Sequence, residues 1–173
     1  MSGEARASSK KFFKSASLAE GVQALKKGSA FRFIAETGVN AGEHHEGTLT
    51  ENIDRNTWVT MSVQRSVDEV QSRLQDGLAF LATVGSTAPF VGLFGTVWGI
   101  YHALTAIGIS GQASIDKVAG PVGEALIMTA FGLAVAVPAV MGYNWLIRRN
   151  KSVMENIRAF SGDVHNVLLA VKK

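Results

Sequence analysis

The sequence predicts an all-α membrane protein, a polytopic helical bundle whose long helices extend into the cytoplasm. Its 173 residues are 47% hydrophobic and only 18% charged. Residues 77–115 form 39 consecutive positions without Asp, Glu, Lys or Arg, and the 30 residues 118–147 carry one charge, Glu124. A hydrocarbon core about 30 Å thick needs roughly 20 helical residues, so each stretch can cross the membrane once.

Composition and charge placement exclude several other classes of protein. The absence of cysteine excludes a disulfide-stapled secreted domain. Eighteen glycines and the low charge content exclude a disordered polyelectrolyte and a coiled-coil rod. Of the 17 Lys and Arg, ten lie in residues 1–76 and six in residues 148–173, on either side of the apolar stretches. We interpret them as topology signals and expect no nucleic-acid partner.

Residues 1–77 are predicted to form a cytoplasmic helical region that leads into the membrane. The apolar periodicity predicts an amphipathic helix over residues 17–37, which ends at Gly38 and is followed by a loop over residues 39–47. Thr50 and Glu51 are expected to open a second helix that runs into the first span without interruption. Residues 43–46 are Glu, His, His and Glu, but adjacent side chains diverge, so we expect no metal site.

Residues 78–147 are predicted to form a transmembrane hairpin. We place its spans at about 78–106 and 121–147, joined by an external loop at about 107–120 that is rich in Gly and Ser. Residues 148–173 are predicted to be a C-terminal cytoplasmic helix with apolar positions three or four apart. Basic residues flank both spans and Lys117 alone lies between them, so the positive-inside rule places both termini in the cytoplasm.

Both predicted spans carry a face of small residues at spacings of three or four. One interpretation is close helix packing, and the other is that Thr96 and Thr129 offer hydroxyls to a central cavity. Pro89 and Pro138 are expected to kink the spans where a neighbour or a water satisfies the freed carbonyl. The remaining packing or pore-lining candidates are Gly85, Ala88, Gly92, Gly95 and Gly99 in the first span and Ala125, Gly132 and Ala136 in the second.

Glu124 is the most informative single residue. An ionisable side chain in a membrane span costs about 2.5 to 3.5 kcal/mol, so it faces protein or water and often marks a proton path. If the second span begins at Pro121, Glu124 instead lies in the first turn, where free backbone N–H groups favour a carboxylate. The residues alone leave both interpretations open. No nucleophile and base set and no phosphate loop is present, so we expect neither an enzyme nor a cofactor.

Two stretches carry a resemblance to a known family. Residues 80–100, which include Gly-Ser-Thr-Ala-Pro-Phe-Val-Gly-Leu-Phe-Gly-Thr-Val-Trp-Gly, and residues 120–140, which begin Gly-Pro-Val-Gly-Glu-Ala-Leu-Ile-Met-Thr, resemble the MotA/TolQ/ExbB proton-channel family and look most like its ExbB branch. The resemblance runs from about residue 59 to 144. It implies that Thr96, Glu124 and Thr129 line or flank an ion pathway driven by the proton gradient. Family members have three spans, and the first of these is not visible here.

The resemblance also implies partners and a location. It implies a homo-oligomeric ring, typically a pentamer, in the bacterial inner membrane around an ExbD-like single-span protein. Proton flow would then be coupled to a TonB-like protein that energises outer-membrane uptake of iron chelates, haem and cobalamin. Within the family, the alternative is a TolQ-like subunit that serves envelope maintenance. From another class, the alternative is a structural membrane scaffold without proton conduction.

Overall fold

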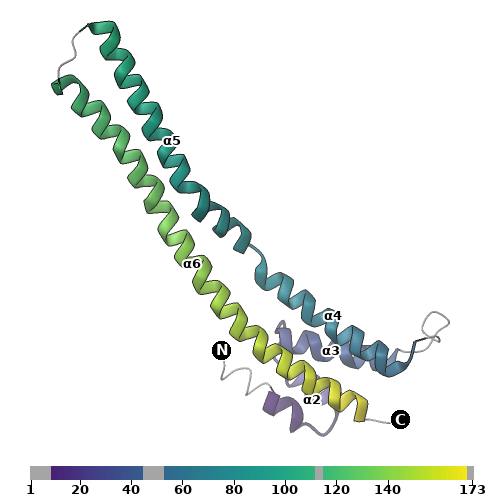
Figure 1. Cartoon of the computed structure of the whole chain (residues 1–173). Helices are drawn as coiled ribbons and strands as arrows, with labels where there is room; N and C mark the ends of the chain where they lie inside the picture. Colours follow the sequence, from purple (N-terminus) through teal and green to yellow (C-terminus); the bar gives the residue numbers. More distant parts are fainter. Residues whose placement is uncertain (1–8, 45–52, 112–114, 171–173) are drawn as a thin grey trace. The chain divides into compact units, whose positions relative to one another are not determined.

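The computed structural model describes residues 9–44, 53–111 and 115–170, and it contains helices and no strands there (Figure 1). The elements are α2 (Leu18–Gln23), α3 (Ala30–Glu43), α4 (Arg55–Gln75), α5 (Leu78–Ser110) and α6 (Ile115–Ala170). They divide into two compact units, residues 1–76 with 149–173 and residues 77–148. We call these the outer unit and the hairpin unit. The prediction of an all-α fold is confirmed.

Three polar side chains fix where the first helices begin. The Ser17 hydroxyl accepts a hydrogen bond from the Glu20 N–H at 3.2 Å and so caps α2. Ser29 caps α3 through the Arg32 N–H, also at 3.2 Å. The Asp54 carboxylate caps α4. Each oxygen satisfies an N–H group that has no partner within its own helix.

The single helix predicted over residues 17–37 is wrong. Gly28 adopts a left-handed backbone, with φ of +74°, between α2 and α3. Gly38, the expected break, lies inside α3 and is buried. A Cβ there would lie 2.8 Å from Leu168 Cδ1, so Gly38 serves close packing and does not end the helix. The loop predicted at residues 39–47 therefore begins later, because α3 continues to Glu43.

Part of the second helix prediction falls outside the described residues. Thr50 and Glu51, its expected start, lie there, as do His45 and Glu46 of the weak metal candidate. The expectation that this helix enters the span without interruption is wrong. It ends at Gln75, and Gly77, with φ of +78°, separates it from α5. The positive φ favours glycine, and the Asn150 side-chain amide donates to the Leu74 carbonyl near the end of α4.

The outer unit has its own apolar core. The most deeply buried aliphatic side chains come from α3, α4 and the end of α6, and the Phe160 ring meets the rings of Phe12 at 5.6 Å and Phe31 at 5.2 Å. Fully burying one such side chain stabilises a fold by about 1.5 to 3 kcal/mol. The five largest of these side chains with less than 2% exposure are Ile34, Ile157, Val59, Val67 and Val164.

The hairpin unit shows the opposite distribution of apolar side chains. It consists of α5 and the first part of α6, which run alongside each other (Figure 1). Its large apolar side chains point outward, and Phe90, Phe94 and Phe131 are each more than 60% exposed. Among the described residues, two helical stretches are long and apolar enough to cross a membrane, and only 17% of the most apolar window of each is buried. A contiguous apolar surface of this kind needs lipid or another protein to cover it.

The loop of the hairpin is shorter than the predicted 107–120. Helix α5 runs to Ser110, where Gly111 caps it with φ of +62°, and α6 has begun by Ile115. Pro121 lies inside α6, so the helix that carries the second predicted span does not begin there. The C-terminal helix predicted at residues 148–173 is a continuation of α6, which ends at Ala170. Gly108 and Ser110 continue α5, and Gly111, whose positive φ favours glycine, ends it.

The core of the outer unit generates a stability prediction. Replacement of Ile157, which is 1% exposed, by Ala is expected to lower the free energy of unfolding by about 2 to 5 kcal/mol, through lost apolar burial and a residual cavity. The matched control is Met61→Ala on α4, whose side chain is 53% exposed. Thermal unfolding in one detergent measures both variants. Equal losses in the two would contradict this account of the core.

Candidate functional site

The small-residue faces of α5 and α6 lie against each other. A Cβ built on Gly132 would lie 2.6 Å from the Ala88 carbonyl oxygen, and one on Gly92 would lie 2.7 Å from the Met128 carbonyl oxygen. Both distances are too short for a real Cβ, and the obstructing atoms are backbone. The two helices therefore approach at Gly92 and Gly132 to a distance that only glycine permits.

The contact continues along both helices. A Cβ on Gly85 would meet Val140 Cγ2 at 2.6 Å, and one on Gly99 would meet Ala125 Cβ at 2.7 Å. A Cβ on Gly95 would lie 3.0 Å from Met128 Cβ. Ala125 and Ala136 are buried as well. Met128 and Val140 were missed as contact residues, because apolar character alone does not say which side chains of a membrane helix face a neighbour.

Thr96 and Thr129 meet within this contact. Thr96 Oγ1 lies 2.5 Å from Thr129 Oγ1, 3.0 Å from the Ala125 carbonyl oxygen and 3.1 Å from the Gly92 carbonyl oxygen. Thr96 is 7% exposed, and Thr129 is half-buried. The structure thus brings together two hydroxyls that lie 33 residues apart in the sequence.

Each hydroxyl has a single proton, which limits the hydrogen bonds that the pair can donate. A Thr hydroxyl has one proton to donate and two lone pairs that accept. When Thr96 donates its proton to a carbonyl of Ala125 or Gly92, the short contact is made by Thr129 donating to Thr96 Oγ1. The bond from Thr96 to the Ala125 carbonyl and the bond between the two hydroxyls both link α5 to α6, whereas the bond to Gly92 stays within α5.

Glu124 lies next to this cluster but does not join it. It precedes Ala125, whose carbonyl oxygen accepts from Thr96, and its own side chain is exposed on α6. Within residues 9–44, 53–111 and 115–170, no side chain pairs with its carboxylate. Because α6 begins by Ile115, Glu124 lies beyond the first two turns, and the helix-cap interpretation that depended on a start at Pro121 is wrong.

The two predicted kink residues lie inside helices. Pro89 is within α5 and Pro138 within α6, and both helices continue past them. Each proline lacks the N–H that would bond to the carbonyl four residues earlier. Gly85 is that earlier residue for Pro89, and Val140 of α6 packs against it. The kinks themselves stay predictions.

Comparison with known proteins decides the family. The family model described as the MotA/TolQ/ExbB proton channel family matches residues 26–159. The chain belongs to this family. The match includes the Gly92 and Gly132 contact, the Thr96 and Thr129 pair and Glu124. Members of the family are proton-channel transport components and not enzymes, and they are integral to the membrane.

Curated relatives named ExbB and TolQ are similar to the chain. Biopolymer transport protein ExbB of Xanthomonas campestris pv. campestris (strain B100) is 49% identical over 142 residues, which is 79% of this chain and 56% of the relative. Biopolymer transport protein ExbB of Neisseria gonorrhoeae is 46% identical over 133 residues, 77% of this chain and 60% of the relative. Tol-Pal system protein TolQ of Haemophilus influenzae (strain ATCC 51907 / DSM 11121 / KW20 / Rd) is 40% identical over 110 residues, 64% of this chain and 46% of the relative. The chain thus spans between about half and three-fifths of the length of these relatives.

The glycine contact gives a prediction with a control on the same helix. Gly132→Ala is expected to destabilise the hairpin by about 1 to 3 kcal/mol, because the new Cβ must push the Ala88 backbone away. Gly123→Ala adds the same methyl group where no atom lies within 4 Å, so its unfolding temperature should be unchanged or slightly raised. Thermal unfolding in detergent compares the two. A Gly132 variant as stable as the Gly123 variant would disprove the close contact.

The hydroxyl pair gives a second prediction. Thr96→Val keeps the shape of the side chain but removes the partner of Thr129, which should cost about 1 to 3 kcal/mol of unfolding free energy. Thr96→Ser, which keeps the hydroxyl, should retain more stability. The matched control is Thr105→Val on the same helix, whose exposed hydroxyl bonds only the Tyr101 carbonyl of its own helix. An equal effect of the Thr96 and Thr105 changes to Val would show that the pair between helices contributes nothing.

Proposed function

We propose that the chain is a proton-channel subunit of an ExbB-like energy-transducing complex in the bacterial inner membrane. The observation that carries the proposal is the exposed Glu124 carboxylate, which lies on a membrane hairpin beside the Thr96 and Thr129 pair. The complex would couple the proton motive force to a TonB-like protein and so to outer-membrane uptake of iron chelates, haem or cobalamin. It would use the proton gradient and no bound cofactor.

The cost of an isolated charge in lipid supports a pathway role for Glu124. A carboxylate in a membrane span is costly unless it faces protein or water, and such residues mark proton relays. Nothing in the described part of the chain pairs with it, and we propose that its partner is water or another subunit. Thr129 lies five residues further along α6, about 7.5 Å along the helix axis. In this arrangement Glu124 exchanges the proton and the half-buried Thr129 lies next along the path.

Thr96 then has a positioning role. It is buried between α5 and α6, and its contact with Thr129 holds the Thr129 hydroxyl in one orientation. Because Thr129 donates its proton to Thr96, its oxygen can present both lone pairs toward the path as acceptors. The small residues around the pair keep the two helices close enough for this contact. Their proposed role is to position the hydroxyls and not to contact the proton.

The exposed apolar surface of the hairpin unit supports assembly into a ring. Phe90, Phe94 and Phe131 are each more than 60% exposed in the described part of the chain. We propose that neighbouring copies and lipid cover them, with a pentamer as the ring, and that Glu124 faces an ExbD-like single-span protein inside it. The basic residues that flank both apolar stretches support a cytoplasmic location for both termini of this chain.

Sequence similarity favours the ExbB branch over the TolQ branch. Identity reaches 49% over 142 residues with an ExbB protein and 40% over 110 residues with a TolQ protein. A TolQ-like subunit of the Tol-Pal envelope-maintenance motor is the second candidate, because the TolQ similarity also covers much of the chain. Both candidates require the same proton-coupled step, and they differ in the partners that the step drives.

The test is rescue of a host that lacks both native systems, with the natural gene that encodes this chain and its partner genes. The scores are uptake of an iron chelate and resistance to detergent. We expect uptake to be restored and Glu124→Gln to abolish it while the complex still assembles, because an amide of the same shape cannot release a proton. The matched control is Glu155→Gln, an exposed carboxylate further along α6, which should leave uptake unchanged.

Each of the other outcomes would indicate a different function for the chain or for Glu124. Rescue of detergent resistance alone would place it in the TolQ branch. Rescue that survives Glu124→Gln would remove proton exchange at Glu124 from the mechanism and favour a structural scaffold. Loss of assembly in the Glu124 variant, with Glu155→Gln assembled normally, would make Glu124 a structural residue and contradict the proposed role.

A further inference from the structure

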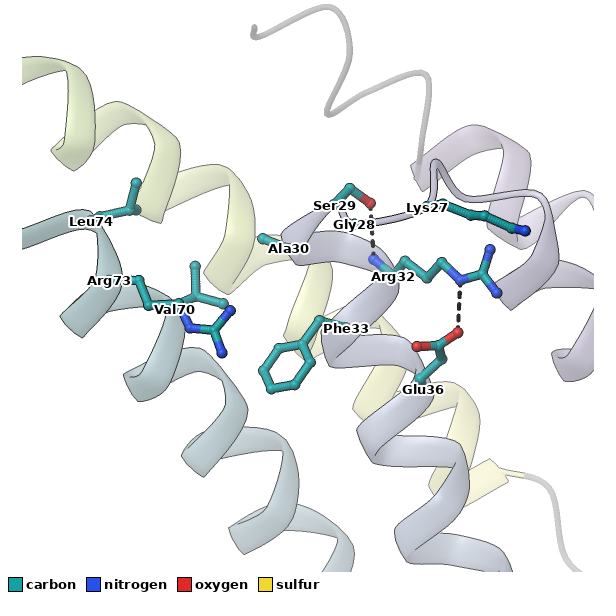
Figure 2. Close-up of a pocket in the computed structure, with 10 residues that line it drawn as sticks. All are labelled: Lys27, Gly28, Ser29, Ala30, Arg32, Phe33, Glu36, Val70, Arg73 and Leu74. Carbon is teal, nitrogen blue, oxygen red and sulfur yellow. Dashed lines mark hydrogen bonds and ion pairs between the residues drawn. The ribbon is translucent and has the colours of Figure 1, made fainter.

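The outer unit contains a cleft that the proposed proton path does not use. It has a volume of about 550 Å³ and lies between the start of α3 and the end of α4 (Figure 2). Three cationic side chains, those of Lys27, Arg32 and Arg73, line it together with a single carboxylate, that of Glu36. The lining therefore carries an excess of positive charge.

The existing ion pairs do not use up the donors of this cleft. Arg32 Nε lies 2.7 Å from Glu36 Oε1, which occupies one of the five N–H donors of the guanidinium group. Figure 2 shows Lys27 and Arg32 extending to the same side of the start of α3. Lys27 is exposed, and within the described residues it has no ion pair. The remaining guanidinium donors and the Lys27 ammonium are thus available to an oxyanion.

The opposite side of the cleft combines a cation with an aromatic ring. Arg73 of α4 pairs with Glu69 on its own helix at 2.6 Å, and its guanidinium carbon lies 5.7 Å from the centre of the Phe33 ring. Phe33, Val70 and Leu74 give the cleft an apolar wall (Figure 2). The first turn of α3 contains no acidic residue to balance its helix dipole. The cleft is therefore both cationic and apolar.

We propose that this cleft binds the phosphate group of an anionic phospholipid. Guanidinium and ammonium groups are well suited to phosphate oxygens, and the apolar wall suits the glycerol and first acyl carbons of the same molecule. A soluble phosphate would use the cationic side chains but not the apolar wall. Arg73 also lies only five residues before Leu78, the first residue of the apolar helix α5. Clusters of basic residues close in sequence to a membrane helix attract anionic lipid.

The test titrates the full chain, purified in detergent, with dioctanoyl phosphatidylglycerol and with zwitterionic dioctanoyl phosphatidylcholine. We expect saturable binding of the first lipid, and a Lys27→Gln, Arg32→Gln double variant should bind it at least about tenfold more weakly, because charge-assisted phosphate contacts are lost. The matched control is a Lys26→Gln, Arg65→Gln double variant, which removes two exposed charges outside the cleft lining and should bind within about twofold of the parent.

Three results would overturn the proposal. The first is equal affinity for the two lipids, and the second is equally weakened binding in both double variants. The third is that inorganic phosphate binds as tightly as phosphatidylglycerol and displaces it. The last would assign the cleft to a soluble phosphate. The exposed Lys27→Gln single variant, with an unchanged helical circular dichroism spectrum, keeps the test valid if the Arg32 change disturbs α3. The assignment does not depend on Glu124, so loss of proton coupling leaves it standing.

Discussion

The backbone contact between Gly92 and Gly132 is the constraint on which the hairpin unit depends. Lipid offers no hydrophobic drive for two membrane helices to associate, so close packing and hydrogen bonds must hold them together. The absence of side chains at these two positions lets the helices approach until backbone meets backbone. That short distance allows Thr96 to reach both Thr129 and the Ala125 carbonyl. The hydrogen bonds between the helices therefore depend on the glycine contact.

The contact between the two hairpin helices contains no charged side chain among the described residues. The hairpin contact is built from small residues and satisfied hydroxyls, and Glu124 remains outside it on the exposed surface of α6. Within the described residues nothing pairs with its carboxylate, and a partner from a neighbouring subunit would fit a role in a larger proton-conducting assembly. The outer unit, by contrast, buries a conventional apolar core and can hold its shape through its own contacts.

Sequence reasoning succeeded where a strong physical rule acts on a long segment. Two long apolar stretches, which together contain a single charged residue, predict membrane helices. Spacings of three or four predict which small residues share a helix face. It failed at helix boundaries. The sequence pattern predicts a break at Gly38, which is a packing contact, whereas the breaks lie at Gly28 and Gly77. A glycine can either end a helix or allow close packing. At Gly38 the outcome depends on the position of Leu168, which is 130 residues away in the sequence and packs against the glycine.

The sequence by itself determined the helical class, the apolar stretches long enough to cross a membrane, and the residue types around Glu124, because these depend on composition and local periodicity. Only the tertiary structure decided that Thr96 bonds Thr129, that α6 is continuous from Ile115 to Ala170, and that Lys27 and Arg32 share a cleft with α4. These features depend on which residues distant in the sequence come into contact. Such contacts are set by packing between elements, which no local pattern in the sequence records.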